Sequence, residues 1–226
     1  MSQSAPTGQG LLQFPVENEE VKRLLDQTLK QQKEWSCETV ANTIFPQSLW
    51  NPEYDRQHLF DRYMSIWPRI HNEPANRHGT YFQRLIAFRQ GEKQVAVNQL
   101  EHIIQTYHDG NHRASALQAA IMDPTKDHTD NRQRGFPCMQ HVIFTPHPAT
   151  QALDITGIFA NQHIFEKAYG NYLGLYRLGK FMAHELGFTL TRVICIASLA
   201  RLGNCSKEKL RDLEAKLQRY AIAEQW

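Results

Sequence analysis

The chain has 226 residues, 41% of them apolar, and a net charge of +2 with acidic and basic residues interspersed. This length is enough to bury one large core, and the balanced charge argues against a nucleic-acid-binding or membrane-surface protein. No run of about 18 apolar residues predicts a membrane span, and residues 1–6 show no apolar signal segment.

The four cysteines are irregularly spaced in a chain of medium length. They are Cys37, Cys138, Cys195 and Cys205. This pattern predicts free thiols in a reducing compartment rather than a disulfide framework, so a cytoplasmic location is expected.

Hydrophobic periodicity predicts a mixture of helices and strands. Residues 1–16 are rich in Gly, Ser, Gln and Pro and are expected to be disordered or loosely packed, whereas residues 17–226 are expected to form one domain. An N-cap at Ser36 and stops at Pro46 and Pro68 delimit the early helices. In chain order we expect helices at 18–35, 36–46 and 59–67, a polar loop at 72–79, a strand at 81–88, a helix at 95–107, strands at 113–122, 139–146 and 151–159, a helix at 163–186, a strand at 189–198 and a helix at 206–222. This order indicates an α+β protein with a mixed sheet.

Cys138 is the residue that most directly indicates chemistry. It follows Pro137 at the start of a predicted strand, and a polar helix start follows the next strand at Asn161. A thiol in such a place can be a nucleophile for covalent catalysis. The alternative is a small buried apolar residue, which is what most free cysteines are.

A series of short motifs occurs in the order, and near the spacing, found in thymidylate synthase and its relatives, the pyrimidine nucleotide C5-methylases and hydroxymethylases. The segment Phe136-Pro137-Cys138 resembles the family's catalytic Pro-Pro-Cys-His. The other motifs are GTYFQR at 79–84, NQLEHII at 98–104, NHR at 111–113 and MDP at 122–124. The resemblance covers roughly residues 77–205. It implies a thymidylate synthase-like mixed sheet with flanking helices, one face of which packs in a homodimer.

The resemblance also implies a transferase that adds a one-carbon unit to C5 of a pyrimidine nucleotide or a related ring. The Cys138 thiolate would add to C6 and make C5 nucleophilic. Because a nearby cation lowers a thiol pKa, Arg134 or Arg113 is the expected activating residue.

Three other residues match family positions with a role in the reaction. Asn171 falls on the asparagine that hydrogen-bonds the pyrimidine amide edge, and Tyr81 on the tyrosine that helps to remove the C5 proton. Glu38 precedes an apolar helix, as the family's catalytic glutamate does. The alternatives are a solvent-facing polar residue for Asn171, a half-buried strand residue for Tyr81 and a first-turn acid favoured by the helix dipole for Glu38.

The family's phosphate and folate contacts are largely absent from this sequence. Its Arg-Ser-x-Asp falls on residues 160–163 (ANQH) and its His-x-Tyr on residues 200–202 (ARL). Altered substrate anchoring through Asn161, His163 and Arg113 is therefore expected. A histidine in place of the pterin-binding aspartate counts against tetrahydrofolate as the one-carbon donor.

Two functions remain open at this stage. The first is a divergent transferase acting on a pyrimidine-like small molecule, as a homodimer without a membrane or nucleic-acid partner. The second is a catalytically inactive thymidylate synthase-like subunit that acts as a dimeric binding or structural protein. A metal enzyme is a weaker third possibility, because only His108 and His112 have ligand spacing and they flank an expected turn.

Overall fold

The computed structural model describes residues 17–90, 95–130 and 135–223, so the prediction for residues 1–16 lies outside it. The protein is α+β, with a four-stranded mixed sheet in the order β3-β4-β5-β7. These strands are β3 (Gln118–Ala120), β4 (Met139–His147), β5 (Ala152–Phe159) and β7 (Thr189–Ala197). β4 pairs antiparallel with both β3 and β5, whereas β5 and β7 are parallel because α7 (Tyr169–Leu186) connects them. Two small two-stranded sheets pair β1 (Phe88–Gln90) with β2 (Val95–Val97), and β6 (Gln162–His163) with β8 (Ala200–Arg201).

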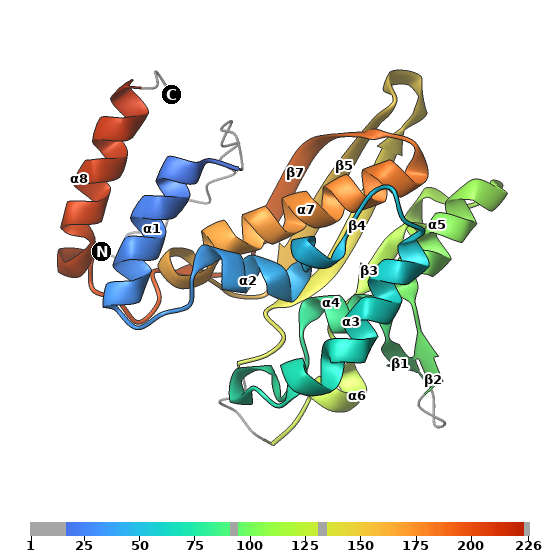
Figure 1. Cartoon of the computed structure of the whole chain (residues 1–226), viewed down its shortest axis with the longest axis horizontal. Helices are drawn as coiled ribbons and strands as arrows, with labels where there is room; N and C mark the ends of the chain where they lie inside the picture. Colours follow the sequence, from blue (N-terminus) through green and yellow to red (C-terminus); the bar gives the residue numbers. More distant parts are fainter. Residues whose placement is uncertain (1–16, 91–94, 131–134, 224–226) are drawn as a thin grey trace, which may run out of the picture.

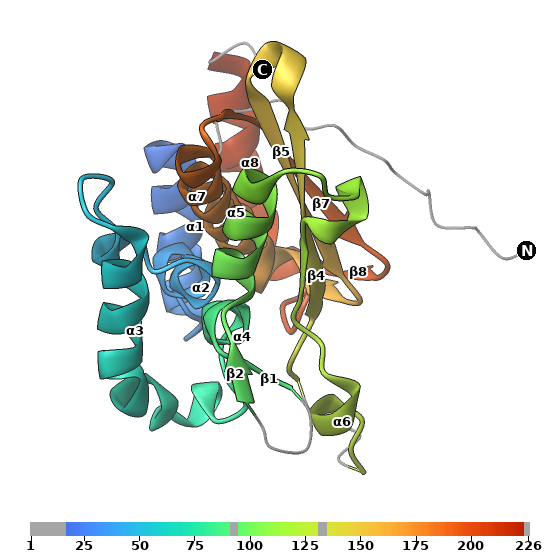
Figure 2. The same ribbon diagram turned by 90° about the vertical axis from the view of Figure 1, so that its right-hand side faces the viewer.

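The helices gather on one face of the four-stranded sheet, as Figure 2 shows with the sheet close to edge-on. α7 lies directly against the sheet, and α2 (Cys37–Ile44) packs on α7. The close approach of α2 and α7 depends on Gly170 and Gly174, because a Cβ atom on Gly170 would lie 2.5 Å from the Cβ of Val40. The remaining helices of this side are α3 (Arg56–His71), α4 (Tyr81–Ile86) and α5 (Gln99–Asp109).

The main core fills the space between the sheet and these helices. Phe45, Phe82 and Phe181 are fully buried, and the ring of Phe45 lies 5.6 Å from that of Phe82 and 5.4 Å from that of Phe181. The aliphatic side chains of the inner sheet face complete this core, among them Leu153 and Ile155.

A second, smaller apolar cluster joins the two ends of the described chain. α1 (Glu19–Gln31) and α8 (Lys207–Ala223) lie side by side at one end of the molecule (Figure 1). Leu24 and Leu29 of α1 and Leu213 of α8 are buried in this cluster with Phe165. None of the helices in the described ranges combines the length and apolar character needed to cross a bilayer.

Most predicted elements are confirmed, including the strands at 139–146, 151–159 and 189–198 and the helix at 163–186, whose first turn is the π-helical η5 (Ile164–Ala168). The strand predicted at 81–88 is wrong: the Thr80 side chain accepts a hydrogen bond from the backbone N–H of Gln83 and starts α4. The strand predicted at 113–122 shortens to β3 because a 3-10 turn precedes it. Pro68 does not end α3, since it lies in the last turn and the helix continues to His71. The remaining short elements are η1 (Gln47–Leu49), η2 (Pro74–Asn76), η3 (Ala114–Ala116), α6 (Pro124–Asp127) and η4 (Pro148–Thr150).

Candidate active site

A cavity of about 380 Å³ lies where β4 begins, between α2, the loop before α4 and the start of α7. This volume is within the range of small-molecule binding sites, about 300–1,000 Å³. The predicted site residues that line it are Tyr81, Cys138, Asn161, His163 and Asn171. The structure therefore brings together side chains from three separate parts of the sequence.

Cys138 lies at one end of the sheet, immediately before the first residue of β4. Its carbonyl accepts a hydrogen bond of 2.9 Å from the backbone N–H of Ala160, which ties this segment to the end of β5. The half-buried thiol donates to the carbonyl of Gly135 at 3.4 Å. Burial raises the pKa of the Cys138 thiol above its ordinary value, and the positive charge of Lys167 opposes that rise.

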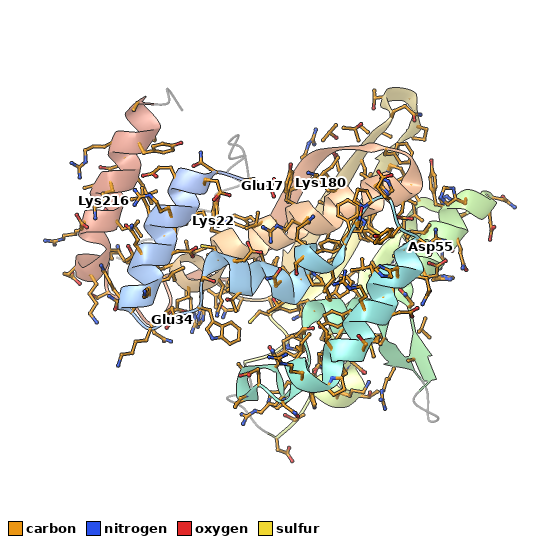
Figure 3. All side chains as sticks on the ribbon, viewed as in Figure 1. Glu17, Lys22, Glu34, Asp55, Lys180 and Lys216 are labelled. Carbon is orange, nitrogen blue, oxygen red and sulfur yellow. The ribbon has the colours of Figure 1, made fainter. Side chains whose placement is uncertain are left out.

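Lys167 is the described cation whose charge lowers the pKa of the Cys138 thiol, and it was not predicted from the sequence. It lies in η5, and its ammonium stands 4.4 Å from the centroid of the Trp35 ring. Burial lowers the pKa of Lys167, while the charge of Glu34 is the largest influence opposing that shift. Glu34, labelled in Figure 3, lies in the connection between α1 and α2. Among the described residues, no carboxylate forms an ion pair with Lys167.

The two arginines expected to activate the thiol do not occupy this position. Arg113 is exposed before η3 and does not line the cavity. Arg134 lies outside the described residues. Within the described chain, Lys167 is thus the cation that acts on Cys138.

Asn171 presents a buried carboxamide to the cavity. Its side chain is on the third residue of α7, only 5% of the residue is exposed, and it makes no hydrogen bond with any other described residue. A ligand in the cavity that offers both a donor and an acceptor would satisfy both hydrogen-bonding functions of this carboxamide. The alternative of a solvent-facing residue does not fit this burial.

Tyr81 lines the cavity from the first turn of α4 rather than from a strand. Its ring lies 5.2 Å from that of Phe136. Burial raises the pKa of Tyr81 well above its ordinary value. The phenol therefore shares the cavity with the thiol and keeps its proton near neutral pH.

Glu38 is not brought to the cavity. Its carboxylate accepts two hydrogen bonds, of 2.7 and 2.9 Å, from the guanidinium of Arg177 on α7, and this partner holds the pKa of Glu38 below its usual range. It occupies the first turn of α2. This geometry matches the first-turn acid and leaves the expected catalytic carboxylate without support.

Asn161 and His163 belong to the segment that replaces the family's Arg-Ser-x-Asp. The Oδ1 atom of Asn161 is buried and has no hydrogen-bond partner in the described chain. His163 follows in β6, and its Nδ1 lies 2.8 Å from the Glu166 carboxylate. Both residues line the cavity, and Glu166 lies behind His163 outside the lining.

The charged residues of the cavity lining are all basic within the described part of the chain. Arg77 and Lys167 carry positive charge, His78 and His163 can, and no aspartate or glutamate lines the cavity there. Arg77 was missed because it lies in the polar loop at 72–79, where the sequence gives no periodic signal. The arrangement favours an anionic ligand, since an opposite charge is attracted strongly inside a partly desolvated pocket.

Comparison of the chain with protein-family models and with curated proteins found no match. The resemblance to thymidylate synthase therefore rests on its motifs alone.

Proposed function

We propose that the protein is a divergent thymidylate synthase-like transferase that adds a one-carbon unit to C5 of an anionic pyrimidine, through a covalent adduct at Cys138. The observation that carries this proposal is the unpartnered carboxamide of Asn171 in the same cavity as the thiol and Lys167. A pyrimidine amide edge offers a donor beside an acceptor, which matches the two hydrogen-bonding functions of an asparagine side chain.

The reaction follows from the chemistry of the ring. The Cys138 thiolate donates an electron pair to C6, and the C5–C6 π pair moves toward C5 and the C4 carbonyl to form an enolate. C5 then attacks a one-carbon electrophile at the oxidation level of formaldehyde; the C=O π pair moves to its oxygen, which takes a proton from water. Loss of the C5 proton restores the C5–C6 double bond as the sulfur leaves with its electron pair, giving the hydroxymethylated ring. Lys167 would stabilise the thiolate during both sulfur steps.

The basic lining supports a phosphorylated substrate rather than a free base. Arg77 enters the cavity from the loop before α4, and Lys167 faces it from the start of α7. Arginine and lysine both bind phosphate, arginine by a planar fork of donors and lysine as a point charge. We assign to them the anchoring that the family gives to other arginines, with Arg113 left to contact a second copy.

Tetrahydrofolate does not fit this cavity on the family's terms. The position that holds the pterin in the family is His163, whose Nδ1 is already engaged by Glu166. No carboxylate of the described chain lines the cavity to receive the pterin N–H groups. The proposed reaction therefore includes no folate step.

The proposal includes the family's fold and its homodimer, with residues 17–226 acting as one cytoplasmic domain. The face of the sheet opposite α7 carries aligned side chains on three strands, with Ile143 beside Thr156 and Thr156 beside Ile194. Ile196 lies on the same face and is 50% exposed. A sheet face that carries these three isoleucines and that no described helix covers supports face-to-face packing with a second copy.

One observation favours the second function, an inactive binding subunit. Burial raises the pKa of Cys138, so the thiol of the free protein is mostly protonated at neutral pH. A subunit that binds an anionic pyrimidine without turnover would use Asn171 and the basic lining in the same way.

The deciding experiment is incubation with 5-fluoropyrimidine nucleotides, followed by mass spectrometry of each cysteine. The transferase predicts an adduct on Cys138 alone, which is lost in Cys138→Ser and retained in Cys195→Ser, the other half-buried thiol. Thermal shifts with nucleosides and nucleotides run in parallel, and the 5′-phosphate should increase the shift. Binding of nucleotides without any adduct would establish the subunit function, and the absence of both would overturn the pyrimidine proposal.

A further inference from the structure

His163, which lines the cavity, forms a pair of titratable groups with Glu166, which lies behind it outside the lining. His163 and Glu166 are three residues apart, and Nδ1 of the imidazole lies 2.8 Å from Oε2 of the carboxylate. The imidazole lines the cavity with 35% of its side chain exposed, whereas the Glu166 side chain is 4% exposed. The carboxylate is thus buried behind a histidine that faces the ligand space.

Glu166 is fixed by a distant loop as well as by its own helix turn. Its Oε1 accepts a hydrogen bond of 2.5 Å from the backbone N–H of Asn204. Gly203 has φ +107°, and a Cβ atom there would lie 2.5 Å from the same oxygen, so only glycine allows this approach. The backbone N–H of Phe165 also donates to the carbonyl of Leu202 at 3.2 Å, which holds the loop against the turn.

This fixed carboxylate decides which nitrogen of His163 carries the proton. An ionised carboxylate accepts hydrogen bonds and donates none, so Nδ1 must be the donor. In the neutral imidazole, Nε2 then keeps its lone pair and is available as a base. The same carboxylate stabilises the imidazolium after Nε2 takes up a proton.

The other titratable residues considered for proton removal are paired elsewhere, already protonated or positively charged. Glu38 is paired with Arg177 outside the cavity. The Tyr81 phenol keeps its proton at neutral pH because burial raises its pKa, so it is not available as a base. Lys167 carries the positive charge that favours the thiolate. Two histidines line the cavity: His78 already accepts a hydrogen bond of 3.1 Å at Nε2 from Nε of Arg77, whereas His163 is held at Nδ1 by a fixed carboxylate.

We infer that His163, positioned by Glu166, is the general base that removes the proton from C5 of the bound ring. This role rests on the proposed function. Nε2 accepts the C5 proton, the C–H electron pair forms the C5–C6 double bond, and the C6–S pair returns to Cys138. The imidazolium then releases its proton to water through the cavity mouth. His163 is the catalytic residue of this step and Glu166 is a positioning residue.

The first test measures the reactivity of the His163 imidazole itself and needs no substrate. Diethyl pyrocarbonate acylates unprotonated imidazole nitrogens, and peptide mapping of the full chain measures the rate at each histidine. We expect His163 to react at least as fast as the exposed His58, to be slowed about tenfold or more by prior carboxamidomethylation of Cys138, and to be slowed in Glu166→Gln while His58 is unchanged. A His163 that is unreactive, or indifferent to both changes, would overturn the inference.

The second test reads the proton transfer in the reaction. Addition of the thiolate to C6 makes C5 basic, so a reacting pyrimidine nucleotide should exchange its C5 hydrogen with deuterium from the solvent. His163→Asn keeps a donor for Glu166 and removes Nε2, so exchange should fall about 100-fold or more, the size of a general-base contribution. Labelling of Cys138 by iodoacetamide should stay within about twofold, showing that the cavity is intact.

The outcomes of the two tests separate this inference from the proposed function. Full exchange in His163→Asn would overturn the inference and leave the transferase standing. No exchange by the unmodified protein on any pyrimidine nucleotide would count against the transferase, and the acylation rates would then decide alone whether His163 is a base held by Glu166.

Discussion

Replacing Glu38 by glutamine is expected to destabilise the protein while leaving its chemistry intact. The carboxylate bridges α2 and α7 through two hydrogen bonds, of 2.7 and 2.9 Å, to the Arg177 guanidinium. The Arg177 side chain is 9% exposed and its Nε has no hydrogen-bond partner in the described chain. Its only other acidic neighbour in that part of the chain is Glu17, 3.8 Å away. Glutamine keeps one acceptor oxygen but leaves the buried cation with the half-exposed Glu17 as its one described countercharge.

The size of the effect follows from this exposure. A hydrogen bond to a charged group contributes about 1.5–3 kcal/mol, and truncating a fully buried ion pair costs about 3–5 kcal/mol. The Glu38 side chain is 41% exposed, so solvent screening reduces the loss. We expect a decrease of about 1–2 kcal/mol in the free energy of unfolding, which for a chain of this length lowers Tm by about 3–6 °C.

The assay is urea unfolding of the two proteins at several pH values. Because Arg177 lowers the pKa of folded Glu38, the stabilisation is fully present above the unfolded pKa, about 4.3. It is lost as the pH falls through the lower folded value. The gap between the two proteins should therefore be constant from pH 7 to about pH 5 and should shrink at lower pH. Glu53→Gln, at an exposed loop position, serves as the control.

Two results would refute this reasoning. A Glu38→Gln protein as stable as the unmodified one at pH 7 would show that the ion pair contributes nothing. A variant of unchanged stability that has lost C5 exchange would instead establish Glu38 as the catalytic carboxylate that the sequence suggested.

Three further predictions concern packing, the thiol and assembly. Gly170→Ala should lower the free energy of unfolding by about 1–3 kcal/mol, because the new Cβ would lie 2.5 Å from a side chain of α2. This overpacking exceeds the gain in helix propensity, which is at most about 1 kcal/mol. Gly135→Ala, with open space around it, should be near neutral, and equal effects of the two changes in urea unfolding would contradict the packing argument. Lys167→Met should raise the pKa of Cys138 and slow alkylation of this thiol at pH 8 several-fold. Lys180→Met, on the exposed side of α7, should leave the alkylation rate unchanged. An unchanged rate in Lys167→Met would show that Lys167 is not the activating cation. Light scattering at micromolar concentration should give twice the chain mass and Ile196→Asp should give a monomer, and a monomeric unmodified protein would contradict the proposed dimer.

The sequence predicted those elements whose pattern repeats over many residues. The strands at 139–146 and 151–159 and the long α7 have clear periods, and the structure confirms them. Residues 81–86 show no clear period, because this short segment is buried on several sides and consists largely of aromatic and aliphatic residues. Their helical state depends on the Thr80 cap and on packing, and a six-residue helix is too short for its period to show.

The residues of the candidate site also differ in whether a local sequence pattern predicts them. Cys138 and Asn171 were identified because short motifs surround them, and both line the cavity. Lys167 reaches the thiol from a π-helical turn, a geometry that sequence patterns do not reveal. Glu166 becomes a partner of His163 only because the loop at Gly203 closes over it from 37 positions further along the chain. The spacing of His163 and Glu166 at i and i+3 was visible, but nothing local indicated that the carboxylate would be buried.

The electrostatics of the cavity favour a ligand-binding role over a purely structural one. In the described chain the lining contains Arg77 and Lys167 and no carboxylate, while the acids that influence Lys167, Glu34 and Glu166, lie outside it. Half-burying the Lys167 ammonium without an ion-pair partner is destabilising, and the Asn171 carboxamide lines the cavity without a hydrogen-bond partner among the described residues. A subunit needed only for assembly could replace these residues with apolar ones and become more stable. Their joint presence beside one half-buried thiol is explained if an anion with an amide edge completes the site.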